Sequence, residues 1–261
     1  LLLFIVVPVA GRFLYGQRGS TMVTVIVSAG AISAAYGIFQ YGILDYNTLD
    51  LRVRGSLGHW MTYSGLLTLV IGVALARILF GERDRLWAAL VMPALALAIA
   101  LTFTRTAMVA ACATVALLFV LKDLRLLAIL PVTAAIFFAA APPGITARFI
   151  STFNMNDATI RDRVAMLNAG RSMVLAHPLT GLGPTMVEKR YSEFRDPSAV
   201  EAVVAHLHNV PMQIAAERGL LALAAWLAFV GIALVDLSRL FRAGEHRMLS
   251  AVALAALVSM L

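Results

Sequence analysis

The chain has 261 residues, of which 61% are hydrophobic and only 13% are charged. Its mean hydropathy of +0.88 excludes a water-soluble globular domain and predicts an all-α polytopic membrane protein. The single cysteine, Cys112, excludes both a disulfide framework and a cysteine metal site. The net charge of +7 does not call for a nucleic-acid partner, because the distribution of the basic residues among the loops accounts for it.

Apolar segments of about 20 residues, the length that crosses a bilayer, recur along the chain. We predict spans at 20–40, 58–80, 86–103, 105–121, 125–141 and 210–236, and truncated spans at 1–15 and from 248 onward. The chain begins with Leu1, so we expect a piece of a longer protein that lacks helices at one or both ends. These spans divide the chain into membrane helices at 1–141, a polar loop at 142–209 and membrane helices at 210–261.

The apolar run from 86 to 121 is broken only by Thr104-Arg105-Thr106. We interpret this break as a tight turn between two helices; a tilted or re-entrant segment at 105–121 is the alternative.

The basic residues predict the orientation of the spans. One set of short loops contains ten Lys or Arg residues, namely Arg12, Arg18, Arg77, Arg83, Arg85, Lys122, Arg125, Arg239, Arg242 and Arg247. The opposite short loops contain only Arg52, Arg54 and Arg105. Because cytoplasmic loops are enriched in Lys and Arg, the large polar loop faces outward, which in a bacterium is the periplasmic face of the inner membrane.

The outward loop has predicted structure of its own. The Pro-Pro-Gly sequence at 142–144 ends the preceding span. Residues 160–176 predict an amphipathic helix with its apolar positions at Val164, Leu167, Val174 and Leu175. On such a helix Arg161 and Arg163 lie about 200° apart, whereas Arg163 and Arg171 lie within about 80° of each other. A further short helix is expected within 187–204.

A turn at Gly181-Leu182-Gly183 follows the amphipathic helix. The backbone N–H groups of Gly181 and Gly183 are candidate anion ligands, although a plain chain reversal is the preferred explanation of the glycines.

The sequence HLHN at 206–209 joins the polar loop to a long apolar helix. Asn209 is predicted to cap this helix, and its positive end favours a neutral His208 that can accept a proton, or an anion beside it. We expect His206 to have the milder role, because alternate residues approaching a helix rarely both point into one site. The alternative is that both histidines merely lie at a hydrated helix terminus.

Taken in order, these motifs resemble the O-antigen ligase/polymerase superfamily. The resemblance rests on Arg163, on HPLTGLG at 177–183, on HLHN at 206–209 and on AERGLL at 216–221, and it covers roughly 50–240. TRTA at 104–107 is similar to the "SRxA" turn of the family, and RGSLGHWM at 54–61 is similar to an earlier outward loop. The chain departs from the family pattern at Met166-Leu167 and at Arg218.

The resemblance implies a fold like that of the C superfamily of glycosyltransferases and an inverting, metal-independent transfer without a cofactor. The donor would be a glycan on undecaprenyl diphosphate, and the acceptor would be lipid A–core in a ligase. A growing glycan in a polymerase, or a protein hydroxyl in an oligosaccharyltransferase, are the alternatives. By resemblance, Arg105 and Arg163 bind the diphosphate and His208 acts on the acceptor. His206, Arg54, Arg171, Asn209, Gly181 and Gly183 are the further predicted substrate-binding residues.

Two rival interpretations are testable. A membrane transporter would carry charged residues in the centres of its spans, whereas the spans between 20 and 141 carry almost none and the polar residues gather in one loop. A metal-dependent glycosyltransferase would need paired outward carboxylates. Asp45 and Asp50 are the nearest pair, but they lack the Asp-x-Asp spacing.

Overall fold

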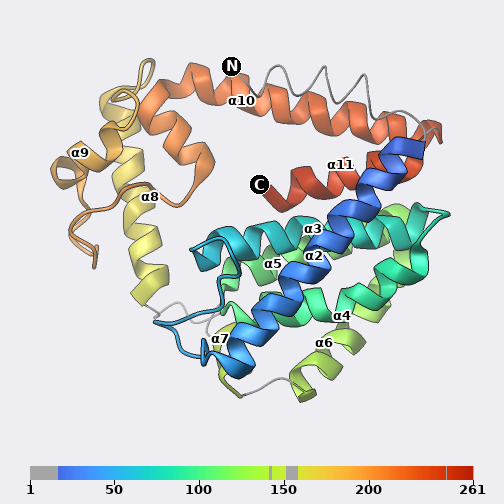
Figure 1. The fold of residues 1–261 in the computed structure, drawn as a ribbon. Coiled ribbons are helices and arrows are strands. Elements are labelled where there is room, and N and C mark those ends of the chain that lie inside the picture. Colours follow the sequence, from blue (N-terminus) through green and yellow to red (C-terminus); the bar gives the residue numbers. More distant parts are fainter. Residues whose placement is uncertain (1–16, 141–142, 151–157, 245, 261) are drawn as a thin grey trace. The chain divides into compact units, whose positions relative to one another are not determined.

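The computed structural model describes residues 17–140, 143–150, 158–244 and 246–260. In these ranges every regular element is a helix, and the extended chain forms only one isolated bridge, between Asn47 and Arg52. The helices follow one another (Figure 1) as α2 (Gln17–Ile43), α3 (Trp60–Phe80), α4 (Arg85–Leu101), α5 (Arg105–Lys122), the 3-10 helix η1 (Leu124–Ala128), α6 (Ile129–Ala140), α7 (Pro143–Ile150), α8 (Ala158–Ala176), α9 (Met186–Phe194), α10 (Val210–Ala243) and α11 (Arg247–Met260).

The hydropathy pattern predicted these helices well. Among the described residues, α2, α3, α5 and α10 are long and apolar enough to cross a membrane, and α4 and α11 are shorter apolar helices. The prediction of an all-α polytopic membrane protein is therefore confirmed. The break at Thr104-Arg105-Thr106 is a turn between two helices, as expected, because α4 ends at Leu101 and α5 begins at Arg105. The predicted span at 1–15 lies outside the described residues.

Two segments differ from the prediction. The span expected at 125–141 is divided between η1 and α6. The Pro-Pro-Gly sequence was expected only to end a span, yet α7 begins at Pro143. Proline is well tolerated in the first turn of a helix, where its missing N–H would have no partner within the helix. The Pro-Pro-Gly sequence therefore also provides the start of a helix.

The chain forms two compact units. The helical unit contains the described residues of 1–149 and 236–261, and the loop unit contains those of 150–235. In the helical unit α3 is the central helix and packs against α2, α4, α5 and α11. A Cβ atom at Gly72 of α3 would lie 3.0 Å from both Thr114 of α5 and Ala255 of α11. Small residues thus let the backbones approach closely, which is how membrane helices commonly associate.

Buried polar side chains join these helices to one another and to a loop. Gln40 near the end of α2 is 3% exposed; its Nε2 donates to Gly55 O at 3.0 Å, and its Oε1 accepts from Gly55 N at 2.8 Å. The Tyr63 hydroxyl donates to Ser33 O at 2.7 Å. Arg77 in the last turn of α3 donates to Ser20 Oγ of α2 at 2.8 Å. These bonds satisfy groups that would be costly to bury alone.

The loop unit is built from α8, α9 and the first part of α10. Its core contains Met166, Met173, Val187, Tyr191 and Leu207, with Ala169 and Ala216 between them. The face of α8 that lies in this core agrees with the predicted one only in part: Val174 packs against the core and Leu167 is partly buried. Val164 and Leu175 are 46% and 69% exposed, whereas the buried apolar positions are Ala165, Met166, Ala169 and Met173. Small residues were preferred there because they allow close packing, as Gly170 shows against Leu207 and Met212.

Candidate functional site

A pair of histidines lies where the loop unit enters α10. Leu207 between them is 1% exposed and belongs to the core of the unit. The histidines on either side of Leu207 are both exposed. Their ring centroids are 4.2 Å apart with an interplanar angle of 53°. The two side chains therefore lie together, contrary to the reason given for a milder role of His206, and the milder role itself stays a prediction.

The backbone of this turn is held in an uncommon conformation. His208 has φ 51°, in the left-handed region that few non-glycine residues adopt. Asn209 then caps α10, because its Oδ1 accepts from Met212 N at 2.9 Å and its carbonyl accepts from Gln213 N at 2.9 Å. The predicted N-cap is confirmed. Strain of this kind persists only where the surroundings impose it, and such residues gather at functional sites.

The surroundings of His208 favour its neutral form. Although the side chain reaches solvent, partial removal of water lowers the pKa of His208, and the nearby charges of His206 and Arg163 lower it further, while Asp162 opposes them. The prediction of a neutral imidazole therefore has support in the structure. The causes are desolvation and cationic neighbours, in addition to the helix end considered from the sequence.

The three arginines of α8 are not equivalent. Arg163 is partly buried and lies close enough for its charge to act on His208. Arg161 and Arg171 are both exposed, and neither is among the charges that shift the pKa of His208. The predicted separation of Arg161 from Arg163 thus agrees with their surroundings. Among the arginines of α8, Arg163 has the strongest link to the histidine pair.

Asp162 is a site residue that sequence analysis missed. It is 7% exposed, and its Oδ1 accepts from Val200 N at 3.0 Å and from Glu201 N at 3.1 Å. Residues 199–201 form a strap across α8, and Arg195 also holds it, since its Nη2 donates to Ala199 O at 2.7 Å. A buried carboxylate that receives backbone N–H groups fixes the strap to α8 and places a negative charge near His208. An aspartate on the face opposite the expected apolar one was the signal that could have revealed it.

The glycine turn is joined to a break in α10. Gly219 has φ 82° and ψ 173°, which interrupts the helical hydrogen bonding there. The turn replaces the lost bonds: Leu182 N donates to Ala216 O at 2.8 Å, Gly183 N donates to Glu217 O at 2.9 Å, and Leu220 N donates to Pro178 O at 2.8 Å. A Cβ atom at Gly219 would lie 2.0 Å from Leu179 O. Only glycine permits this approach.

This arrangement gives Gly181 and Gly183 a structural role. Gly181 N donates to His177 O at 3.0 Å, and the amide of Gly183 is occupied by Glu217. A Cβ atom at Gly181 would lie 2.5 Å from Arg218 N. The two amides are therefore engaged within the protein, and the geometry supports the chain-reversal interpretation over anion binding by these N–H groups.

Arg54 and Arg105 lie in the helical unit, so the structure does not relate them to the histidine pair. Arg105 is the first residue of α5. Arg54 Nη2 donates to the Tyr46 hydroxyl at 3.1 Å, and its guanidinium lies 5.3 Å from the Tyr46 ring centroid. Arg52 lies close enough to Arg105 for the two charges to interact. Burial lowers the pKa of Arg52, Asp50 opposes this, and the charge of Arg105 lowers it further.

Arg52 is thus a second residue that sequence analysis did not single out. Its Nε donates to Leu49 O at 2.6 Å, and its guanidinium lies 4.9 Å from the Trp60 ring centroid. The His59 and Trp60 rings stack with centroids 4.3 Å apart. Two neighbouring arginines, one supported by an aromatic ring, form a cationic group suited to a phosphate. Arg52 and Arg54 stand in the same short loop, and nothing in the sequence pattern distinguishes one from the other.

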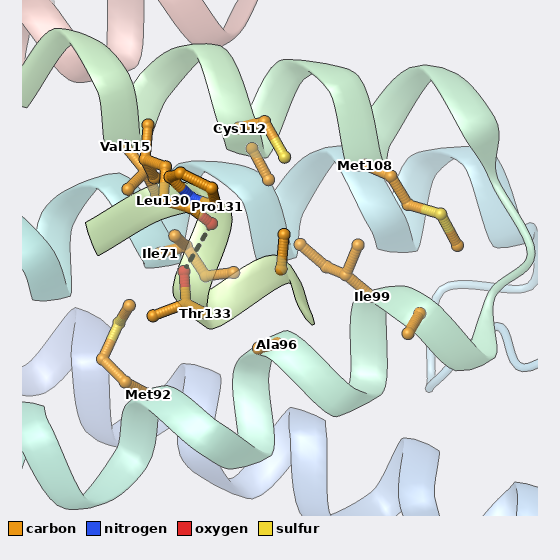
Figure 2. A pocket seen from close by; sticks show the side chains of 13 residues that line it. Ile71, Met92, Ala96, Ile99, Met108, Cys112, Val115, Leu130, Pro131 and Thr133 are labelled. Atoms are coloured by element: carbon orange, nitrogen blue, oxygen red, sulfur yellow. Dashed lines mark hydrogen bonds between the residues drawn. The ribbon is translucent and has the colours of Figure 1, made fainter. Parts of the chain in front are cut away.

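A separate cavity of about 540 Å³ lies within the helical unit, among α3, α4, α5 and α6. Figure 2 shows Met92, Ile99, Met108 and Cys112 around it. Its one hydroxyl, that of Thr133, donates to Leu130 O at 3.1 Å, as drawn in Figure 2. The wall therefore suits hydrocarbon and offers nothing for general acid–base chemistry, so we place the candidate site at the histidine pair.

Comparison with known proteins identifies the family of the chain. No curated protein matched it. The family model described as O-antigen ligase, Wzy_C, matches residues 88–227, which is more than half of the chain. The match runs from α4 into α10 and includes Arg105, Arg163, the glycine turn and the histidine pair. Histidines, arginines and the glycine-locked kink thus fall inside the matched region, and the chain belongs to the O-antigen ligase family of membrane proteins.

Proposed function

We propose that the protein transfers a glycan from undecaprenyl diphosphate to an acceptor hydroxyl at the periplasmic face of the bacterial inner membrane, with lipid A–core as the favoured acceptor. Membership of the O-antigen ligase family supports an enzyme that ligates or polymerises glycans. The observation that carries the proposal is the exposed pair of His206 and His208, 4.2 Å apart, with Arg163 acting on His208.

The chemistry follows from these groups. His208 accepts the proton of the acceptor hydroxyl as its oxygen bonds to the anomeric carbon of the donor sugar. The bond between that carbon and the diphosphate oxygen breaks, and the carbon is inverted. Negative charge grows on the departing lipid diphosphate, and arginine stabilises it through bidentate, charge-assisted hydrogen bonds. Arg163 is the arginine of the loop unit that we assign to this role, and Arg105 is the further candidate that the family resemblance suggests.

The apolar cavity supports a substrate carried on a lipid. Its wall contains no charged group and its hydroxyl is satisfied internally. A hydrocarbon chain loses nothing by entering such a space, whereas a sugar or phosphate would lose its hydrogen bonds to water.

A reconstituted assay tests the proposal directly. Purified protein in vesicles is given a glycan on undecaprenyl diphosphate together with lipid A–core, and product is followed by mass. Transfer by the unaltered protein and its absence with His208→Ala are the expected results. No transfer to any offered hydroxyl, combined with donor-independent flux of a solute across the vesicle, would favour the transporter interpretation.

The surface glycan of a strain lacking the gene identifies the acceptor. Loss of all polymer from lipid A–core supports ligation. A single repeat unit on lipid A–core indicates that the protein is a polymerase. Intact lipopolysaccharide together with proteins that lack their glycan indicates transfer to protein.

A further inference from the structure

The side chain of Gln213 extends from α10 to residues 206–209, which carry the two histidines and are called the histidine turn below. Its Oε1 accepts the N–H of Leu207 at 2.8 Å, six residues earlier in the chain. Gln213 is partly buried, and its own backbone N–H is bonded to Asn209 O at 2.9 Å. Gln213 is therefore attached to both sides of His208, at Leu207 through its side chain and at Asn209 through its backbone.

This double attachment explains how His208 keeps a left-handed backbone. A residue other than glycine loses free energy of about 1–2 kcal/mol in that conformation, so a free turn would relax to an extended form. Relaxation at His208 would carry its ring away from His206. Here the turn is closed by Gln213 on one side and by burial of Leu207 on the other, where Gly170 lies against the Leu207 side chain.

We propose that Gln213 is a positioning residue, whose amide oxygen holds the turn that sets the His206 and His208 rings side by side. This inference rests on the proposed function of His208, because a positioning residue needs a catalytic group to position. Gln213 does not touch substrate in this proposal. It acts by accepting the Leu207 N–H. This role needs a side chain that carries an acceptor atom and is long enough to reach Leu207 from α10.

Substitutions at Gln213 distinguish the effect of its acceptor oxygen from the effect of its size. Gln213→Leu keeps a similar size and removes the acceptor, so Leu207 N–H is left unpaired. Gln213→Glu keeps an oxygen in the same place and serves as the conservative rescue. Asn168→Ala is the matched control, because it removes another side-chain hydrogen bond of the loop unit, from Asn168 Nδ2 to Asp196 Oδ2 at 2.9 Å, away from the turn.

Two measurements on the whole protein in nanodiscs do not depend on turnover. Hydrogen exchange reports protection of the Leu207 amide, and nuclear Overhauser contacts between labelled imidazoles report the pairing of His206 with His208. We expect Gln213→Leu to lose both signals, Gln213→Glu to retain them and Asn168→Ala to leave them unchanged. The groups that act on His208, namely His206, Arg163 and Asp162, are unaltered in all three variants.

Transfer assays complete the test. With Gln213→Leu we expect kcat to fall about ten- to a hundredfold, as for a misplaced catalytic group, while the KM for donor stays within about twofold. The acid limb of its pH profile should move toward the ordinary histidine value, because the ring leaves His206. Gln213→Glu should restore kcat.

The possible failures are distinguishable. Retained amide protection and ring contacts in Gln213→Leu would overturn the positioning role. Loss of kcat in Gln213→Glu, measured above the acid limb of its own pH profile and despite a protected amide, would overturn it too. If Gln213→Leu separates the rings and transfer continues at the original rate, the positioning role is supported and the proposed use of His208 as the base fails.

Discussion

The helical unit and the loop unit are stabilised in different ways. Helices of the helical unit meet through small residues, as at Gly72 between α5 and α11, and through hydrogen bonds between side chains and neighbouring helices. In the loop unit, side chains hold irregular backbone in place: Asp162 binds the strap, Asn209 caps α10 and Gln213 closes the histidine turn. Regular helices satisfy their own backbone and need only packing, whereas strained turns need specific partners.

This difference has a functional lesson. A reactive group can be exposed and still be fixed when the irregular segment that carries it is bonded from several sides. The loop unit should therefore be sensitive to single polar substitutions, and the helical unit should respond mainly to changes of volume.

The largest expected effect lies at the histidine pair itself. His208→Ala should reduce glycan transfer at least about a hundredfold, because loss of a positioned base typically costs 10²–10⁴-fold. Membrane insertion and unfolding temperature should be unchanged, since the His208 side chain is exposed. Transfer is measured with purified protein and insertion by fractionation; near-normal transfer would remove histidine-base catalysis from consideration.

Arginine variants extend the comparison to both units. Arg163→Lys and Arg105→Lys should each weaken use of the diphosphate donor about tenfold or more, because lysine lacks the bidentate fork. Arg161→Ala is the control, since Arg161 is exposed and does not act on His208. The measurement is kcat/KM for the donor. An inactive Arg161→Ala beside an active Arg163→Ala would show that the wrong arginine of α8 has been assigned.

Substitution of Gly219, where α10 is kinked against the glycine turn, tests how far the loop unit depends on close backbone contacts. Gly219→Ala should lower the free energy of unfolding by about 2 kcal/mol or more, because the positive φ is strained and the added Cβ meets Leu179 O at 2.0 Å. Gly231→Ala in the same helix meets nothing within 4 Å and should leave the unfolding temperature unchanged or slightly raised. Equal stability of both variants in detergent would contradict the kinked arrangement.

The acidity of His208 predicts a smaller, graded effect. Its lowered pKa keeps the base neutral at pH 7, so transfer should hold from neutral pH to below the ordinary histidine value of about 6.5 and then fall. His206→Ala removes one of the lowering charges, so the acid limb should move to higher pH. The stability of the folded protein should change in the same direction with pH. Because folding lowers the pKa of His208, its contribution to stability is present above about pH 6.5 and is lost as the pH falls toward the pKa of the folded state. Rate–pH profiles of both proteins are compared, and coincident acid limbs would argue against coupling of the two rings.

Removal of divalent ions should have no effect. The described residues contain no group of three or more His, Cys, Asp or Glu that could hold a metal, and Asp45 and Asp50 are both exposed. Arginine and the helix ends remain charged when metal is withdrawn. Transfer in excess EDTA should proceed at an unchanged rate; a loss that Mg²⁺ or Mn²⁺ restores would instead give Asp45 and Asp50 a central role.

The sequence by itself determined the membrane class, most helix boundaries and the cap at Asn209. These features depend on composition and on neighbours a few residues apart, because the bilayer demands long apolar segments and a helix end demands a local acceptor. It also placed Arg163, His206 and His208 in the polar loop, where chemistry has access to water.

Tertiary structure alone decided which groups meet. The buried face of α8 was set by the close approach of Gly170 to Leu207, so Val164 and Leu175 stayed exposed despite their hydrophobicity. The two histidine rings came together on either side of the buried Leu207, and the kink at Gly219 drew the amides of the glycine turn onto α10. Arg52 came close enough to Arg105 for their charges to interact, and Arg54 was engaged by Tyr46. Each outcome depends on contacts between residues distant in sequence, and no local pattern records which partner a side chain will find.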